Sequence, residues 1–273
     1  MTDTDLYERG VRTAAACWEA LAHSTSSADV HRLPHVSVAV FADEPEQSIY
    51  NNAILGHGLA PAERSAALEA MEALYAAADI SFFAAWVHET DRGMRDELTR
   101  RGYAVDTTTR AMGMSLDDVS LPRPEIELAP AAWREHLRLI GVSSALLRDL
   151  DPAALHLLVA QRGGESVATA FGFDHEGDCG IYNVGTLAHS RRRGFGTALT
   201  ATLLHDALAR GCRTASLQST PAAERMYGAL GFRDLGRIIE YTPTRRGARS
   251  QSPLSGSPFS TKKGCESGGC VRA

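Results

Sequence analysis

The sequence has few cysteines and no long apolar segment. The cysteines are odd in number and scattered, which favours reduced thiols over a disulfide framework; they are Cys17, Cys179, Cys212, Cys265 and Cys270. No apolar stretch approaches the roughly 20 residues that a membrane-spanning helix needs. The opening segment MTDTDLYERG also lacks the basic start and apolar core of a secretory signal. We therefore expect a cytoplasmic protein without membrane contact.

A strong charge of either sign is also missing. The formal net charge of -5 gives no reason to expect a nucleic-acid partner. Basic residues gather only after Thr244, where six Lys or Arg face one acid. Because residues 243–273 are rich in Ser, Gly and Pro and have no periodic apolar pattern, we predict a disordered basic tail. This tail offers one alternative function, the binding of nucleic acid or of an acidic protein.

Two segments of the chain resemble two others further on. Residues 48–55 (SIYNNAIL) are similar to residues 180–187 (GIYNVGTL), and the helix-like stretches before Gly102-Tyr103 and Gly231-Phe232 end alike. The chain is 44% hydrophobic, which is enough to form a sizeable core. We therefore predict two related α/β units, separated near the polar, proline-containing segment 117–124.

Apolar periodicity and turn residues place the secondary-structure elements. In the first unit we expect strands at 36–41, 49–55, 81–87 and 107–115, and helices at 61–78 and 91–101. In the second unit we expect helices at 130–149, 197–210 and 221–230, and strands at 157–161, 166–173, 181–187, 214–218 and 233–241. Gly163-Gly164 indicates a hairpin between two of these strands.

The segment 190–199 (SRRRGFGTAL) connects a predicted strand to a predicted helix. The first amides of a helix lack partners and favour an anion, and Gly194 and Gly196 allow a ligand to approach the backbone. A dinucleotide-binding loop needs a third glycine, but Leu199 stands there. A P-loop needs a lysine before its Ser or Thr, but the residue before Thr197 is Gly196. The pattern that remains is Arg191-x-x-Gly194-x-Gly196.

This pattern resembles the pyrophosphate loop of the GNAT acetyltransferase superfamily, which reads Gln/Arg-x-x-Gly-x-Gly/Ala. A second block, residues 220–232 (TPAAERMYGALGF), resembles the family's Asn-Pro-x-Ala segment and the helix after it, which carries a tyrosine and ends in Gly-Phe. The resemblance covers residues 125–242. It implies a mixed, mostly antiparallel sheet flanked by helices in each unit, with acetyl-CoA as co-substrate and no metal.

The resemblance also implies which residues contact the cofactor. Amides at the start of the helix would converge on the pyrophosphate, and one of the arginines would meet a phosphate; these residues are Arg191, Arg192, Arg193, Gly194, Phe195, Gly196 and Thr197. Backbone groups of Val184 and Thr186 would bind the pantetheine arm, with Gly185 suited to a bulge in the strand. Tyr227 occupies the position of the family's general acid.

The general base is not evident in the sequence. Members that use a glutamate carry it early in the fourth strand, where this chain has Gly180. Asp178 and Tyr182 share the face of that strand if it is regular, and either could act through water.

We therefore expect an N-acetyltransferase whose acceptor is a primary amine of a small molecule or a protein. The alternative is a non-catalytic acyl-CoA-binding regulatory module, which the missing glutamate favours. Residues 121–242 form the expected catalytic unit, and 1–120 a degenerate unit without cofactor. In the first unit's loop, residues 56–64, a proline and a glutamate stand where a phosphate would bind. No nucleic-acid partner is expected, and the oligomeric state is open.

Overall fold

The structure is a computed structural model of the chain. It describes residues 1–25, 27–45, 50–141, 150 and 155–244. The predicted disordered tail therefore lies outside the described residues, apart from Pro243 and Thr244, and so does most of the second half of the helix expected at 130–149.

The first half of the chain contains three helices and five strands among its described residues. In chain order these are α1 (Asp3–Ala22), β1 (Ala28–Leu33), β2 (Val36–Phe41), β3 (Asn52–Leu55), α2 (Pro61–Ala77), β4 (Ala84–His88), α3 (Arg92–Arg100) and β5 (Tyr103–Ser115). A short 3-10 turn, Leu116–Asp118, follows.

The described part of the second half has nearly the same order of elements. They are β6 (Leu128–Ala129), α4 (Trp133–Ile140), β7 (Leu157–Arg162), β8 (Glu165–His175), β9 (Asp178–Thr186), α5 (Phe195–Ala209), β10 (Thr214–Ser219), α6 (Glu224–Ala229) and β11 (Arg233–Pro243). Gly163 and Gly164 both have positive φ and form the predicted hairpin turn between β7 and β8.

All eleven strands join in one sheet, in the order β1-β2-β3-β4-β11-β5-β10-β9-β8-β7-β6. The pairing directions are the same in both halves. β2 is antiparallel to both β1 and β3, as β8 is to β7 and β9; β3 is parallel to β4, as β9 is to β10. The mixed, mostly antiparallel sheet is therefore as expected, but the two units share one continuous sheet.

The last strands of the two halves are exchanged at the centre of this sheet. β11, which ends the second half, pairs with β4 of the first half, and β5, which ends the first half, pairs with β10 of the second. β5 and β11 also pair with each other along most of their length. Neither half therefore completes its part of the sheet with its own final strand.

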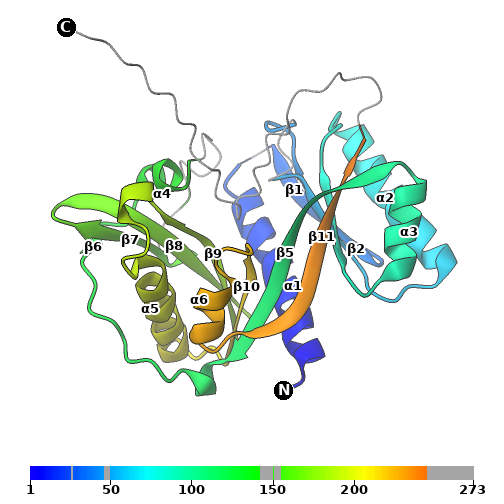
Figure 1. Cartoon of the computed structure of the whole chain (residues 1–273). Helices are drawn as coiled ribbons and strands as arrows, with labels where there is room; N and C mark the ends of the chain where they lie inside the picture. The colour runs from blue at the N-terminus through cyan, green and yellow to red at the C-terminus, as the bar shows by residue number, and fades with distance from the viewer. Residues whose placement is uncertain (26, 46–49, 142–149, 151–154, 245–273) are drawn as a thin grey trace, which may run out of the picture.

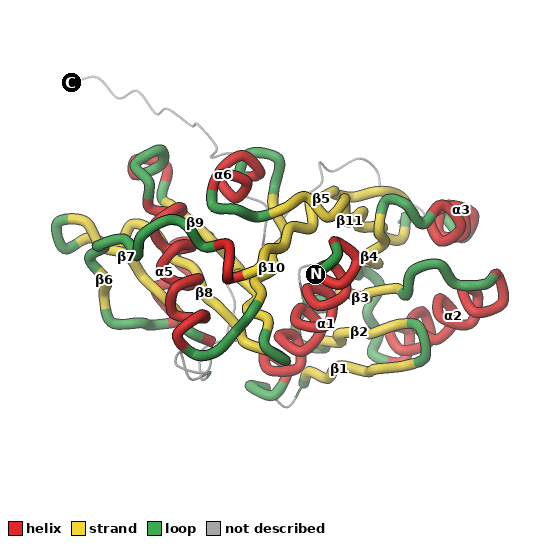
Figure 2. Tube along the Cα trace, turned by 90° about the horizontal axis from the view of Figure 1, so that it is seen from below, coloured by secondary structure: helices red, strands yellow, loops and turns green. Residues whose placement is uncertain are grey.

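The helices lie on both faces of a bent sheet. Figure 2 shows the sheet arching over α1, which contacts strands of both halves, from β1 and β2 to β8 and β9. α4 shares this inner face, where side chains of α1 and α4 form one apolar cluster with Phe171 and Tyr182. The outer face carries α2 and α3 on the first half and α5 and α6 on the second, each pair over its own cluster (Figure 1).

Three elements, α1, β1 and the short β6, were not predicted from the sequence. A signal for α1 was present, because Thr2 and Asp5 form a capping box: the Asp5 amide donates to the Thr2 hydroxyl and the Thr2 amide to the Asp5 carboxylate. Several expected boundaries also differ. β5 begins at Tyr103 rather than 107, because it continues beside β11, and β4 begins at Ala84 rather than 81.

Candidate active site

β9 separates from β10 after a short stretch of pairing. The two parallel strands pair only from Asp178–Thr214 to Gly180–Ser216, although both continue beyond that point. Val184 and Thr186 lie in the separated part of β9. A gap in a parallel sheet leaves backbone groups on the facing edges available to a ligand.

β9 has a bulge in the part that is separated from β10. The β8 register passes from Thr169–Gly185 to Phe171–Tyr182, so β9 carries an extra residue between these pairs. Asn183 has a positive φ of 53° and makes the bulge. The expectation of a bulge at Gly185 was therefore wrong, since Gly185 is paired with Thr169. Asparagine is one of the few non-glycine residues that enter this region readily.

α5 begins directly beside the gap. Gly194 caps it with a φ of 85° and no neighbour within 4 Å of where a Cβ would lie. The first amide bonded within the helix is that of Ala198, so the amides of Phe195, Gly196 and Thr197 point out of its first turn. A short anion-binding surface results, with the positive end of the helix dipole behind it.

The three arginines before the helix differ in role. Arg191 donates from Nε to the carbonyl oxygen of Thr186, at 3.1 Å, which fixes the loop against the end of β9. All three arginines are exposed, and Arg192 has a positive φ of 60°. Because the Arg191 side chain already holds the loop, the guanidinium groups of Arg192 and Arg193 are the better placed for a ligand phosphate.

Gly196 and Val184, both predicted to contact the cofactor, lie beside α6, the helix that carries Tyr227. A Cβ on Gly196 would lie 3.3 Å from Sδ of Met226 and 3.7 Å from Cγ1 of Val184, so α5, α6 and β9 meet at one point. Tyr227, next to Met226, is buried with only 6% of its surface exposed. Burial raises the pKa of its hydroxyl, which therefore stays protonated at neutral pH.

None of the predicted base positions offers a free carboxylate. The ring of Tyr182 occupies the place that a side chain on Gly180 would take. Asp178 is buried and accepts three hydroxyl hydrogen bonds of 2.7–2.8 Å, from Thr13, Thr214 and Ser216. These bonds join α1 to β9 and β10, and they give Asp178 a structural role.

Sequence reasoning missed His136 on α4. Its Nδ1 lies 2.8 Å from the Thr169 hydroxyl, which itself donates to the carbonyl oxygen of Leu158. Nδ1 must therefore carry the proton, leaving Nε2 as the acceptor that faces the Asn183 amide nitrogen at 3.5 Å. Burial lowers the pKa of His136 to about 3, so the ring is neutral. The one signal for His136 in the sequence is its place among the regularly spaced apolar residues of a predicted helix.

The loop before α2 corresponds to the loop before α5, but two of its backbone amides are hydrogen-bonded to carboxylates. The Gly58 amide donates to Oδ2 of Asp91 at 2.9 Å, and the Ala60 amide donates to Oε2 of Glu63 at 2.8 Å. Pro61, at the first position of α2, has no N–H to offer. Two amides of this loop are thus already bonded to carboxylates, and the first position of α2 offers none.

Among the described residues, no group of three or more His, Cys, Asp and Glu side chains is arranged to hold a metal ion. No helix in the described ranges is long and apolar enough to cross a membrane.

Comparisons with known proteins agree with this geometry. Residues 117–232 match the acetyltransferase (GNAT) family. The fold is similar to that of a GCN5-related N-acetyltransferase from Kribbella flavida, with a TM-score of 0.66 and 19% identity over 86% of this chain and 95% of that one. A GCN5-related N-acetyltransferase from Sphaerobacter thermophilus gives a TM-score of 0.57 and 17% identity over 84% and 92%. No curated protein sequence matches the chain.

A protein described as functionally unknown, from Staphylococcus epidermidis, has a similar fold, with a TM-score of 0.56 and 12% identity over 80% of this chain and 95% of that one. At such identities the likeness concerns the fold alone. Residues 117–232, between β5 and β11, are therefore similar in sequence to the GNAT family, and the fold as a whole is similar to that of two solved N-acetyltransferases over most of their length.

Proposed function

We propose that the protein is an acetyl-CoA-dependent N-acetyltransferase that acts in the cytoplasm on a primary amine of a small molecule or a protein. The observation that supports this best is the coincidence of three features at one place. These are the gap between β9 and β10, the bulge at Asn183 and the open first turn of α5. Together they form an elongated site with an anion-binding end.

The residues at this site fit the cofactor. Outward amides of residues 195–197 and the exposed Arg192 and Arg193 suit the pyrophosphate, and a side chain at Gly194 or Gly196 would fill part of that space. Hydrogen bonds to a charged group contribute about 1.5–3 kcal/mol each, so several amides can hold a pyrophosphate without a metal. The separated edge of β9, with Val184 and Thr186, suits the pantetheine arm.

When bound, acetyl-CoA would supply a thioester to an acceptor amine: a C–N bond forms, the C–S bond breaks, and the attacking nitrogen loses a proton to solvent. Tyr227 would donate its proton to the leaving sulfur and regain one from solvent, and its burial and raised pKa keep the hydroxyl protonated before the reaction. Holding both reactants in this gap reduces the entropy cost of their meeting.

We further propose that the chain is a tandem GNAT protein whose first half binds no cofactor. The matching order and pairing of elements in the two halves supports the tandem. Two observations support the absence of a cofactor in the first half: Asp91 and Glu63 already accept hydrogen bonds from two amides of its loop, and Pro61 has no N–H to offer. The domain boundaries 1–120 and 121–242 stay predictions.

A second candidate is a non-catalytic acyl-CoA-binding regulatory module. The ring of Tyr182 over Gly180 and the hydroxyl-bound Asp178 favour it, because neither position provides a base. The two functions are distinguished by following thiol release from acetyl-CoA with and without a panel of primary amines. Amine-dependent release with formation of the acetylated amine supports the transferase. Tight binding of acetyl-CoA with release no faster than in buffer, across the panel, supports the regulatory module.

A further inference from the structure

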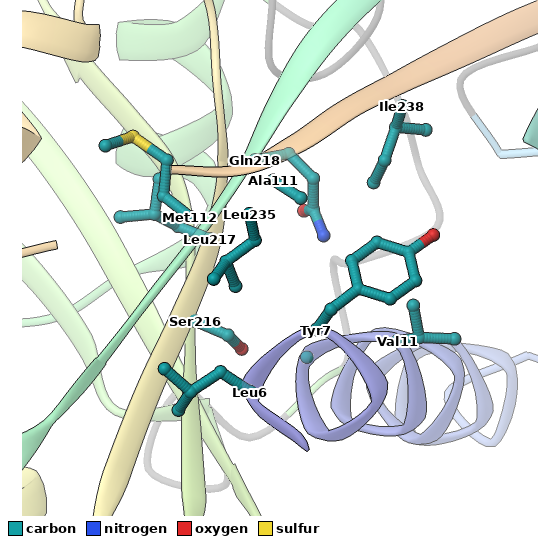
Figure 3. A pocket seen from close by; sticks show the side chains of 11 residues that line it. Leu6, Tyr7, Val11, Ala111, Met112, Ser216, Leu217, Gln218, Leu235 and Ile238 are labelled. Carbon is teal, nitrogen blue, oxygen red and sulfur yellow. The ribbon is translucent and has the colours of Figure 1, made fainter. Parts of the chain in front are cut away.

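A small pocket lies on the inner face of the sheet, beneath the first turns of α1 (Figure 3). Tyr7 and Val11 of α1 form one side of it. Gln218 of β10 and Ile238 of β11 are among the residues on the other side, so the exchanged central strands and α1 enclose it together. The pocket thus depends on elements from both halves of the chain.

The pocket borders the gap between β9 and β10. Pairing of β9 with β10 ends at Ser216. Gln218 lies two residues further along β10, where the edge of this strand faces the gap. α5 packs over the opposite face of the sheet, with Ile181 and Leu217, whereas Tyr182 belongs to the inner cluster. A cofactor held at α5 and running through the gap would therefore present its far end toward the inner face, where the pocket lies.

One polar atom in the pocket has no partner. Oε1 of Gln218 is buried and accepts no hydrogen bond from any described residue. Ser216 also lines the pocket, but its hydroxyl proton is already donated to Asp178. Leaving a buried carbonyl unpaired costs about 1–3 kcal/mol, so this position favours a ligand that brings an N–H or O–H donor.

The other residues that line the pocket indicate which kind of hydrogen-bond donor a ligand must bring. No charged side chain lines the pocket, and most of its wall is apolar, including Val11, Leu235 and Ile238. The enclosed part has room for a group about the size of one water molecule, which matches an amino group rather than a whole acceptor. A neutral carbonyl stabilises the protonated form of an amine much less than a carboxylate does, so it leaves more of the amine in its reactive, neutral form.

We propose that this pocket receives the acceptor's amino group, with Oε1 of Gln218 accepting a hydrogen bond from one of its N–H groups and the apolar wall contacting the carbon that bears it, while the short alkyl or aryl remainder lies outside the enclosed part. This inference rests on the proposed function and narrows its acceptor to a small primary amine with an apolar group. It also gives the first half of the chain a role in acceptor binding, because α1 and β5 line the pocket.

Binding is tested with phenethylamine as probe and with spermidine and glucosamine for comparison. The amines are titrated into the full chain, with and without coenzyme A, while the side-chain amide signals of the glutamines are followed by NMR. Phenethylamine is expected to shift the Gln218 signal at lower concentration than the other two. A Gln218 signal unmoved by phenethylamine in both titrations overturns the proposal.

Substitution of Gln218 provides a second readout. Gln218→Met keeps the length of the side chain and removes the acceptor, and it should lower kcat/KM for phenethylamine about 10-fold or more. Gln161→Met on β7, remote from the pocket, should leave it unchanged. Gln218→Glu should bind phenethylamine more tightly but move the pH profile of kcat to higher pH, a shift that a merely structural role would not cause.

The outcomes separate this proposal from the proposed function. Acetyl-CoA binding should be equal in the parent chain and the Gln218 variants. If acetyl-CoA binds and phenethylamine is acetylated equally well by Gln218→Met, the pocket is not the acceptor site and the proposed function stands. If acetyl-CoA does not bind the parent chain, the proposed function fails, and the NMR titration still decides whether the pocket binds an amine.

Discussion

The side-chain amide of Asn183 faces Nε2 of His136 at 3.5 Å, and this contact links the bulge of β9 to α4. The two residues lie at the level where β9 has left β10. Because His136 is neutral and its other nitrogen is held by Thr169, the ring offers Asn183 a fixed acceptor. The contact therefore stabilises a backbone conformation that few residues adopt.

Asn183→Gly and Asn183→Ala form a matched pair that tests this point. Both remove the amide, but only alanine must place a Cβ in the left-handed region, at a cost of about 1–2 kcal/mol. We expect both variants to be less stable than the parent chain and the alanine variant to be the less stable of the two, by about 1 kcal/mol. Urea unfolding measures this; equal stabilities would mean that the bulge relaxes in the variants.

Tyr227→Phe tests the assignment of the general acid. The ring remains to fill its buried site, but the proton donor is lost, so kcat should fall by about 10²-fold or more. Affinity for acetyl-CoA, measured by calorimetry, should change little. A kcat within a factor of two of the parent value would show that another group, or water, protonates the leaving thiolate.

Glu240 on β11 gives the stability of the protein a pH dependence. It is buried, its Oε1 has no partner among the described residues, and burial, together with nearby Asp106, raises its pKa to about 8. Between the ordinary value of 4.5 and pH 8, the folded chain holds a proton there that the unfolded chain has lost. Its contribution to stability therefore falls as pH rises through this range, by about 1.4 kcal/mol for each pH unit, and is constant above it.

Glu240→Gln should remove that dependence. We expect the variant to be more stable than the parent chain at pH 8.5 and similar to it at pH 4.5, as measured by urea unfolding at both values. Glu72→Gln on α2, where the carboxylate is partly exposed and meets Arg101, is the control and should not raise stability at pH 8.5. A Glu240 variant that is less stable than the parent at pH 8.5 would contradict a buried, protonated Glu240.

The turn from β9 into α5 could be predicted from the sequence because its signals are local. Gly194 and Gly196 stand where the chain turns from β9 into α5, and the apolar, alanine- and leucine-containing sequence of the helix follows at once. The exchange of β5 and β11 could not be predicted in this way. Nothing within Arg233–Pro243 says that its partner is Ala84–His88 rather than an element of its own half.

The finer details of the site could not be predicted from the sequence. The bulge was expected at Gly185 because glycine is the usual residue with positive φ, but the register places it at Asn183, whose amide has a partner on α4. The buried state of Asp178 depends on Thr13, more than 160 residues away in the sequence. The pocket at Gln218 depends in turn on α1, which was not predicted.

The most direct test of the account is calorimetric titration of acetyl-CoA into the full chain and two variants at one position. Gly196→Asp places a carboxylate where the pyrophosphate should bind, whereas Gly196→Asn places a neutral group of the same size against Met226. We predict one acetyl-CoA bound per parent chain, weaker binding to the asparagine variant and at least a further 10-fold loss in the aspartate variant. Two sites per chain, or equal affinities of the two variants, would contradict a single cofactor site at the start of α5.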